Sequence, residues 1–318
     1  MPPARLWLFV AAVLGIGWAL PAAASAQSSS ARFELLRAQD LRVASVAYRL
    51  SLANSALCGD ALAPQHGLIL HSIEQYGAAD REGAALHFGL TDSVNVMAVV
   101  EGSPAAKAGL ATDDRLLSVN GLSLTADADG SQRTPSRIWV QRAHQIISDA
   151  MQKGQVVFRV AGSRGGEHEV RFRADRGCPA DVELRPGGDV NAWADGERVV
   201  ISAGILRRCR NDDDLALVIA HELAHNLLHH SRPSRSPRNR QGRLFLPSST
   251  RSGGTQEAEE EADRLAVRLT RAAGYDLSGA ESFLTGLTGI SPPASQVRTH
   301  PELDRRLASL KAEIAAGG

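Results

Sequence analysis

Several features that would place a protein in a specialised class are scarce in this sequence. Its 318 residues contain three cysteines and 4% aromatic residues. Its 35 basic residues balance its 35 acidic residues, so the composition gives no reason to expect nucleic acid as a partner. None of Cys58, Cys178 and Cys209 stands in a Cys-x-x-Cys or Cys-x-x-His pattern. Zinc ligation by cysteine and thiol catalysis are therefore not expected.

Long apolar runs are also rare, and the one that stands out lies at the start of the chain. Arg5 supplies a positive charge, residues 6–20 are apolar, and residues 24–26 read Ala-Ser-Ala, the A-x-A pattern of a cleavage site. A membrane span needs about 20 apolar residues, and this run is shorter. The pattern predicts a signal peptide, residues 1–26, cut after Ala26, and no transmembrane segment in the mature chain. We therefore expect a periplasmic or secreted protein.

The cysteines of an exported chain can form a disulfide, and an odd number leaves one thiol. The sequence favours a pair between Cys58 and Cys178, because Cys58 closes an N-terminal helical segment and Cys178 begins the C-terminal domain. Sequence alone does not fix this pairing.

The strongest chemical signal is the H-E-x-x-H motif at residues 221–225. It lies within an apolar run, residues 215–228, that predicts a helix. Residues four apart share a helix face, so His221 and His225 can present imidazole nitrogens to one Zn²⁺ ion. Glu222 then faces the attacking water, and its carboxylate can take a proton from that water and return it to a leaving amine.

The motif alone also occurs by chance, so a third protein ligand is the next requirement. Catalytic zinc takes three protein ligands and keeps one position open. Residues 257–263 read E-A-E-E-E-A-D and begin a second helix with apolar residues at helical spacing. Glu259 and Asp263 share one face of that helix. Glu260 and Glu261 are interpreted as solvated acids that favour a helix N-terminus.

This pair of helices resembles the zinc metallopeptidases typified by the CAAX prenyl proteases, which have relatives in mitochondrial and bacterial-envelope quality control. The resemblance rests on H-E-L-A-H followed by E-x-x-x-D. It implies one Zn²⁺ per chain, held by His221, His225 and Glu259, with Asp263 orienting a ligating histidine. It also implies a mainly helical, gluzincin-type domain with a small edge sheet.

Two further motifs extend the resemblance. Asn191-Ala192-Trp193-Ala194, followed by a strand at residues 199–202, resembles the family's N-A-aromatic-A turn and edge strand, which borders the cleft and pairs with the substrate backbone. Thr299-His300-Pro301 with Arg305 resembles the family's T-H-P-x-x-x-x-R element. The resemblance implies that His300 acts as a fourth ligand at rest or as an oxyanion stabiliser, and that Arg305 supports this element.

Two histidines and a long polar segment follow the predicted metal-binding helix. His229 and His230 are not expected to bind metal, because residues 226–228 continue the helix where another zinc-protease group turns at a glycine. Residues 231–256 are rich in Arg, Ser, Pro and Gly and are longer than most ordered loops. They are interpreted either as a lid over the cleft or as a disordered insertion.

A second module precedes the zinc motif. Residues 101–110 read E-G-S-P-A-A-K-A-G-L, and Asn120-Gly121 is a strong turn signal. A helix at residues 138–151 and strands at residues 156–160 and 169–172 follow. The pattern resembles a bacterial PDZ domain.

The resemblance to a PDZ domain implies a groove between a sheet edge and a helix that binds an extended polypeptide. Its carboxylate-binding loop is expected near residues 83–89. Asp113 stands where the usual pattern has glycine. The alternative is a small β-domain that serves as a spacer.

These features predict an α+β chain in four segments: a signal peptide (1–26), an N-terminal helical segment (27–82), a PDZ-like, β-rich domain (83–175) and a zinc metallopeptidase domain (176–318). The predicted function is a zinc-dependent endopeptidase that cleaves misfolded or regulated proteins of the bacterial envelope. One alternative is a binding or chaperone module with a self-blocked zinc site. Another is a zinc amidase acting on cell-wall peptides, against which the PDZ-like module argues because such modules bind polypeptide.

Overall fold

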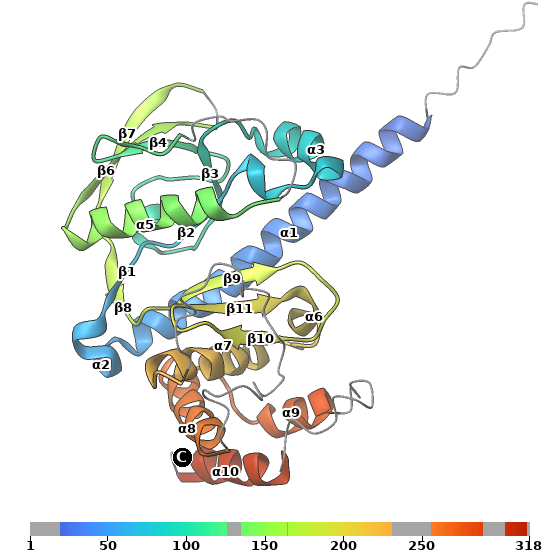
Figure 1. Cartoon of the computed structure of the whole chain (residues 1–318), viewed down its shortest axis with the longest axis vertical. Helices are drawn as coiled ribbons and strands as arrows, with labels where there is room; N and C mark the ends of the chain where they lie inside the picture. Colours follow the sequence, from blue (N-terminus) through green and yellow to red (C-terminus); the bar gives the residue numbers. More distant parts are fainter. Residues whose placement is uncertain (1–19, 126–134, 164, 231–255, 289–302, 317–318) are drawn as a thin grey trace, which may run out of the picture.

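The computed structural model describes residues 20–125, 135–163, 165–230, 256–288 and 303–316. One long helix, α1 (Leu20–Ala53), runs beside two modules, as Figure 1 shows. It packs against α3 (Ala78–Phe88) and β3 (Val94–Val99) in the first module. In the second module it packs against α7 (Asp212–Leu227), α8 (Gln256–Ala272) and β9 (Asp181–Arg185). Among these residues, none of the helices combines the length and apolar character that crossing a bilayer requires.

The first module, the sheet module (residues 63–177), contains a six-stranded antiparallel sheet. Its strands run in the order β2-β3-β4-β6-β7, with β5 paired to β4. Helix α5 packs against β2 and β4 and buries its apolar face (Figure 1). The elements are β2 (Leu68–His71), η2 (Ile73–Gln75), α3 (Ala78–Phe88), β3 (Val94–Val99), α4 (Pro104–Lys107), β4 (Arg115–Val119), β5 (Leu122–Ser123), α5 (Ile138–Gln152), β6 (Val156–Ala161) and β7 (Glu167–Phe172).

The expected turn at Asn120-Gly121 joins β4 to β5. Asn120 has φ 47° and Gly121 has φ 81°, so both central residues adopt positive φ, as tight hairpin turns require. The sheet itself begins at Leu68, upstream of residue 83, where the sequence pattern set the start of the PDZ-like domain.

The segment expected to form the carboxylate-binding loop is a helix, so this prediction was wrong. Helix α3 covers residues 83–88 and packs against α1. Gly83 lies inside this helix, where an added Cβ would come within 3.4 Å of the Phe33 ring on α1. Gly89, with φ 63°, ends the helix. The two glycines therefore mark a close helix contact and a helix C-cap rather than a ligand-binding loop.

After α1, the chain passes between the two modules twice more, in two strands that pair with each other. β1 (Ala63–Gln65) enters the sheet module and pairs antiparallel with β8 (Asp175–Gly177), which leaves it. A disulfide beside them joins Cys58, at the end of α2 (Ser55–Cys58) and before η1 (Gly59–Ala61), to Cys178. The structure thus has the pairing that the sequence favoured. Burial raises the pKa of the remaining thiol, Cys209, to about 12, which keeps it protonated and unreactive.

The second module, the helical module (residues 178–316), is built around helix α7. A small sheet in the order β10-β11-β9 lies on one side, with β10 antiparallel and β9 parallel to β11. Helices α8 and α9 pack on the other sides of α7, and α10 packs against α8. The elements are β9 (Asp181–Arg185), β10 (Ala192–Ala194), β11 (Arg198–Ser202), α6 (Ala203–Leu206), α7 (Asp212–Leu227), α8 (Gln256–Ala272), α9 (Ala280–Thr288) and α10 (Leu303–Ala316).

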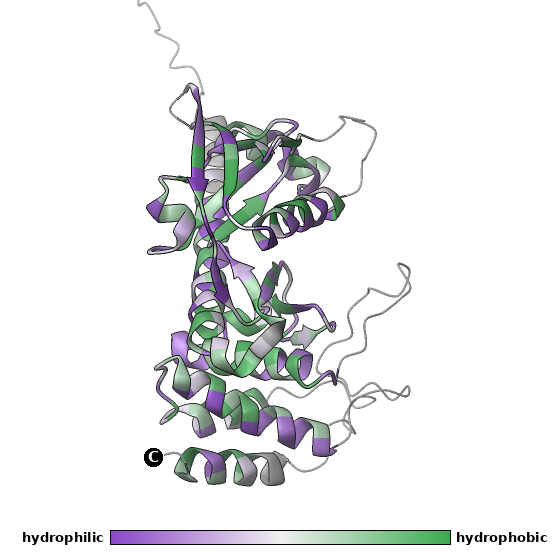
Figure 2. Cartoon of the chain, turned by 90° about the vertical axis from the view of Figure 1, so that its left-hand side faces the viewer, coloured by the Kyte–Doolittle hydropathy of each residue, from purple (hydrophilic) through white to green (hydrophobic). Residues whose placement is uncertain are grey.

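The two modules have separate hydrophobic cores. One core joins the six-stranded sheet to α5, and the other joins α1, the small sheet and helices α7 to α10. Figure 2 shows hydrophobic stretches within both modules. The predicted α+β class, with a β-rich module preceding a mainly helical one, is confirmed.

Candidate metal centre

Helix α7 carries the H-E-x-x-H motif into the interior of the helical module. Asn211 caps the helix, since its side chain accepts a hydrogen bond from the backbone N–H of Asp214 at 3.0 Å. Three acidic residues, 212–214, then fill the first turn, where the positive end of the helix dipole favours them. Residues 214–225 are all buried, because α1, α8, α9, β10 and β11 surround the helix.

The three expected metal ligands converge on one point. His221 Nε2 and His225 Nε2 are 3.1 Å apart. Each is 3.5 Å from an oxygen of Glu259, which α8 brings from 34 residues beyond His225. Donors bound to one tetrahedral Zn²⁺ at about 2.0–2.1 Å lie roughly 3.3 Å from each other, so these three residues fit that ion.

Asp263 contacts His221 at Nδ1, the ring nitrogen that does not face Glu259. Its Oδ1 is 2.9 Å from Nδ1 of His221, and its side chain is 6% exposed. Because an ionised carboxylate only accepts hydrogen bonds, His221 donates from Nδ1 and directs the lone pair of Nε2 toward Glu259. A nitrogen lone pair and a carboxylate that face each other at 3.5 Å are stabilised by a cation between them. The chemistry of the donor set therefore fits a metal.

Glu222 lies next to His221 in the same buried turn and is 5% exposed. A carboxylate at this position can exchange protons with a water molecule close to the three converging side chains. The next turn is tied to the small sheet by Asn226. Its side chain donates to the carbonyl of Arg198 at 3.1 Å and accepts from the N–H of Gly196 at 2.8 Å.

The residues expected to bind substrate backbone lie beside α7. Ala192, Trp193 and Ala194 form β10, which pairs with β11 and stands at the end of the strand order. Asn191 precedes this strand and is buried, and its carbonyl accepts a hydrogen bond from the N–H of Ser202 at 2.9 Å. The Trp193 ring is covered by the guanidinium of Arg185 at 5.0 Å. The sequence motif therefore forms an edge strand next to the helix that carries the H-E-x-x-H motif.

Some expected site residues fall outside the described part of the chain. His300 and the arginine-rich segment at residues 231–255 are among them. Arg305 belongs to α10, whose backbone packs against α8, but its side chain is not among those described.

Sequence reasoning missed two residues near the ligands. His230 Nδ1 is 3.2 Å from His225 Nδ1, and His230 Nε2 is 3.3 Å from Glu261 Oε2. Glu261 therefore contacts a histidine, although it was interpreted as a solvated acid. Among the described residues, the converging donor group consists of His221, His225 and Glu259, and His229 and His230 are not part of it.

The comparison with protein families agrees with the position of this site. The sequence model of peptidase family M48 matches residues 173–246 and 249–314, which include all three converging donors. This part of the chain is therefore similar to peptidases of family M48. A PDZ domain model matches residues 96–132 of the sheet module. The M48 match identifies a peptidase family and implies a metal.

Two curated relatives bear the name beta-barrel assembly-enhancing protease. The one from Yersinia pestis is 26% identical over 165 residues, which are 42% of this chain and 34% of the relative. The one from Escherichia coli K12 is 26% identical over 155 residues, which are 39% of this chain and 32% of the relative. These alignments thus span about a third of the length of the relatives.

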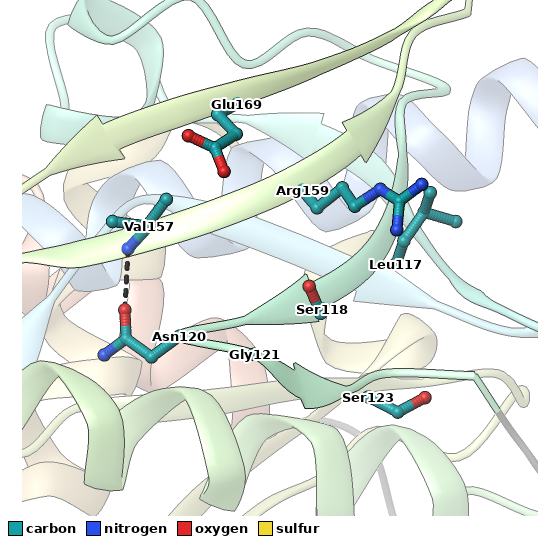
Figure 3. Close-up of a pocket in the computed structure, with 8 residues that line it drawn as sticks. All are labelled: Leu117, Ser118, Asn120, Gly121, Ser123, Val157, Arg159 and Glu169. Carbon is teal, nitrogen blue, oxygen red and sulfur yellow. Dashed lines mark hydrogen bonds between the residues drawn. The ribbon is translucent and has the colours of Figure 1, made fainter.

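The converging donors are distinct from the residues around a surface hollow on the sheet module. Figure 3 shows this hollow, where Asn120 accepts a hydrogen bond from the N–H of Val157 at 2.8 Å. Its lining contains none of the converging donors. The hollow therefore adds no group to the metal centre. It is lined by Leu117, Ser118, Asn120, Gly121, Ser123, Val157, Arg159 and Glu169.

Proposed function

We propose that this chain is a zinc-dependent endopeptidase that hydrolyses misfolded or regulated proteins of the bacterial cell envelope. The observation that carries the proposal is the convergence of His221, His225 and Glu259 within 3.5 Å of each other, one residue from the buried Glu222. The M48 match and relatives named as proteases support a peptidase rather than a binding module with a blocked zinc site.

The proposed roles follow from the chemistry of these groups. His221, His225 and Glu259 hold one Zn²⁺, which when bound supplies Lewis acidity to the peptide carbonyl and to the attacking water. Glu222 takes a proton from the water at its carboxylate and passes it to the departing amine nitrogen. Asp263 keeps the hydrogen of His221 on Nδ1, so that Nε2 stays free of a proton.

Polypeptide substrates are expected to lie along β10. An edge strand offers backbone N–H and C=O groups to an extended peptide, and β10 lies against the helix that bears Glu222. This placement supports Asn191, Ala192, Trp193 and Ala194 as the substrate-binding segment. We also propose that the PDZ domain binds polypeptide and presents it to this segment, because such domains recognise extended chains.

His300 and Arg305 complete the proposal. His300 serves as a fourth metal ligand at rest or as a donor to the oxyanion, and Arg305 supports the segment that carries it. Export to the periplasm, after a cut behind Ala26, is supported by the signal-peptide pattern and by the Cys58–Cys178 disulfide, since disulfides persist in oxidising compartments.

Hydrolysis of unfolded casein by the purified mature chain tests the proposal, with wild type compared to Glu222→Gln at matched zinc content. Gln has nearly the same shape but cannot accept the proton, so we expect at least about a hundredfold loss of kcat/KM, in the range that general-base catalysis contributes. Cleavage by wild type with zinc retained and activity lost in Glu222→Gln supports the assigned roles. Equal cleavage by both proteins would exclude Glu222 as the base.

A further inference from the structure

We propose that His230 is a positioning residue for the metal site: it orients the imidazole of His225, and Glu261 fixes His230 in turn. The proposal rests on the metal site described under the proposed function. It adds to that site a second carboxylate that acts on a ligating histidine, because Glu261 contacts His230 and His230 contacts His225. The H-E-x-x-H and E-x-x-x-D motifs do not specify either residue.

The backbone after α7 brings His230 back onto the helix. The helix ends at Leu227, and His229 adopts a left-handed conformation with φ 57°. This turn reverses the chain, so that the N–H of His230 donates to the carbonyl of His225 at 2.9 Å. The two rings then lie with their centroids 5.3 Å apart and their planes at 66°. The contact is therefore built into the helix terminus.

The carboxylate of Glu261 determines where the hydrogens of both rings lie. A carboxylate only accepts, so Nε2 of His230 donates to Glu261 across 3.3 Å. In a neutral ring the Nδ1 of His230 is then an acceptor, and His225 donates to it from Nδ1 across 3.2 Å. This arrangement leaves the lone pair on Nε2 of His225, the atom that lies 3.5 Å from Glu259. A metal needs that lone pair.

The two ligating histidines are therefore held in parallel ways by the same helix. Helix α8 provides Asp263 behind His221 directly, and Glu261 behind His225 through His230. The contacts of Asp263 and Glu261 differ in strength. The Asp263 contact is shorter, at 2.9 Å, and its side chain is 6% exposed, whereas Glu261 is 55% exposed and screened by water. We expect the contact of His230 with His225 to contribute less to metal affinity than the contact of Asp263 with His221.

The test measures the Zn²⁺ dissociation constant of the full mature chain by competition with a chromogenic chelator. Loss of an outer hydrogen-bond partner typically weakens metal binding 10–100-fold. We expect about tenfold weaker binding for His230→Ala and about threefold for Glu261→Gln, with Asp263→Asn, which removes the stronger contact, near the upper end of that range. His230→Asn, whose side-chain oxygen can accept in place of Nδ1, should recover most of the affinity.

Two matched controls separate positioning from general damage. His229→Asn changes the neighbouring exposed histidine and keeps a residue that tolerates positive φ. Glu260→Gln removes the adjacent acid of α8, which accepts from Gln256 instead. Both should bind Zn²⁺ like wild type. The d–d absorption spectrum of the Co²⁺-loaded protein gives a second readout, and it should shift in His230→Ala but not in the controls.

The outcomes distinguish this inference from the function on which it rests. Wild-type affinity and an unchanged Co²⁺ spectrum in His230→Ala would overturn the inference and leave the metal site intact. If His230→Ala fails to fold, as judged by circular dichroism, Glu261→Gln decides, because its side chain is mostly exposed. A wild-type chain that binds no Zn²⁺ would remove the metal site itself.

Discussion

Helices α7 and α5 each pack against a sheet of their module, but they are enclosed to different extents. Helix α7 is buried on every side over residues 214–225. Helix α5 buries one stripe and leaves residues such as Ile138 71% exposed. Polar residues of α5 can therefore face water, whereas those of α7 must find partners inside the protein.

This difference explains why the polar residues of α7 are informative about function. His221, Glu222 and His225 are 5–8% exposed and follow the apolar residues 215–220 of the helix. A buried polar group destabilises the fold if it lacks a partner, and two partners of His221, Glu259 and Asp263, come from the distant helix α8. The enclosure of α7 also depends on α1, which precedes it by more than a hundred residues.

The largest expected effect concerns the disulfide that ties α2, just beyond α1, to the helical module. Cys58 and Cys178 are separated by 120 residues, so opening the bond releases a long loop in the unfolded chain. We expect the double variant Cys58→Ala/Cys178→Ala to lose about 2–5 kcal/mol of unfolding free energy. Urea denaturation measures this loss. Reductant should lower the midpoint of wild type but leave that of the double variant unchanged.

Two isoleucine substitutions test the contrast between the helices directly. Ile219 of α7 is fully buried, so Ile219→Ala leaves a cavity and should cost about 2–5 kcal/mol. Ile138 of α5 is mostly exposed, so Ile138→Ala should change stability by about 0.5 kcal/mol or less. Equal losses in urea denaturation would contradict the difference in enclosure.

A smaller, pH-dependent effect is expected where the modules meet at α1. Burial raises the pKa of Asp40 to about 7, against the opposing charge of Arg137 and with a further contribution from Glu183. Those two residues pair across the modules at 3.0 Å. The folded state thus binds the Asp40 proton more tightly than the unfolded chain, so the contribution of Asp40 to stability falls between about pH 4 and pH 7.

Asp40→Asn should remove this pH dependence. As the pH rises from 5 to 8, the free energy of unfolding should fall less in the variant than in wild type. The difference should be on the order of 1–2 kcal/mol. The measurement is the urea midpoint at both pH values. Identical pH dependence in the two proteins would show that Asp40 titrates as an exposed carboxylate does.

The elements that local pattern defines were predicted well. The helix expected at residues 138–151 is α5 (Ile138–Gln152), and the apolar run at residues 215–228 lies within or next to α7 (Asp212–Leu227). The strand expected at residues 199–202 is part of β11 (Arg198–Ser202). These predictions hold because the spacing of apolar residues reports directly which face of an element is buried.

The features that depend on tertiary contacts were not predictable in the same way. Gly83 suggested a loop, but it lies within α3, where it faces Phe33 of the distant helix α1. The contact of His230 with His225 depends on positive φ at His229, a residue that gives no glycine-like signal. The convergence of Glu259 with the histidines was predicted from a family resemblance rather than from local pattern, since α8 follows a long intervening segment.

The zinc content of Glu259→Gln tests the central claim most directly, with Glu260→Gln as the matched control. Both variants change one acid in the same turn of α8, but only Glu259 converges with His221 and His225. After equilibration at limiting free Zn²⁺, we predict one zinc per chain in wild type and Glu260→Gln, and a large loss in Glu259→Gln. Full zinc content in Glu259→Gln at wild-type affinity would contradict the assigned metal site.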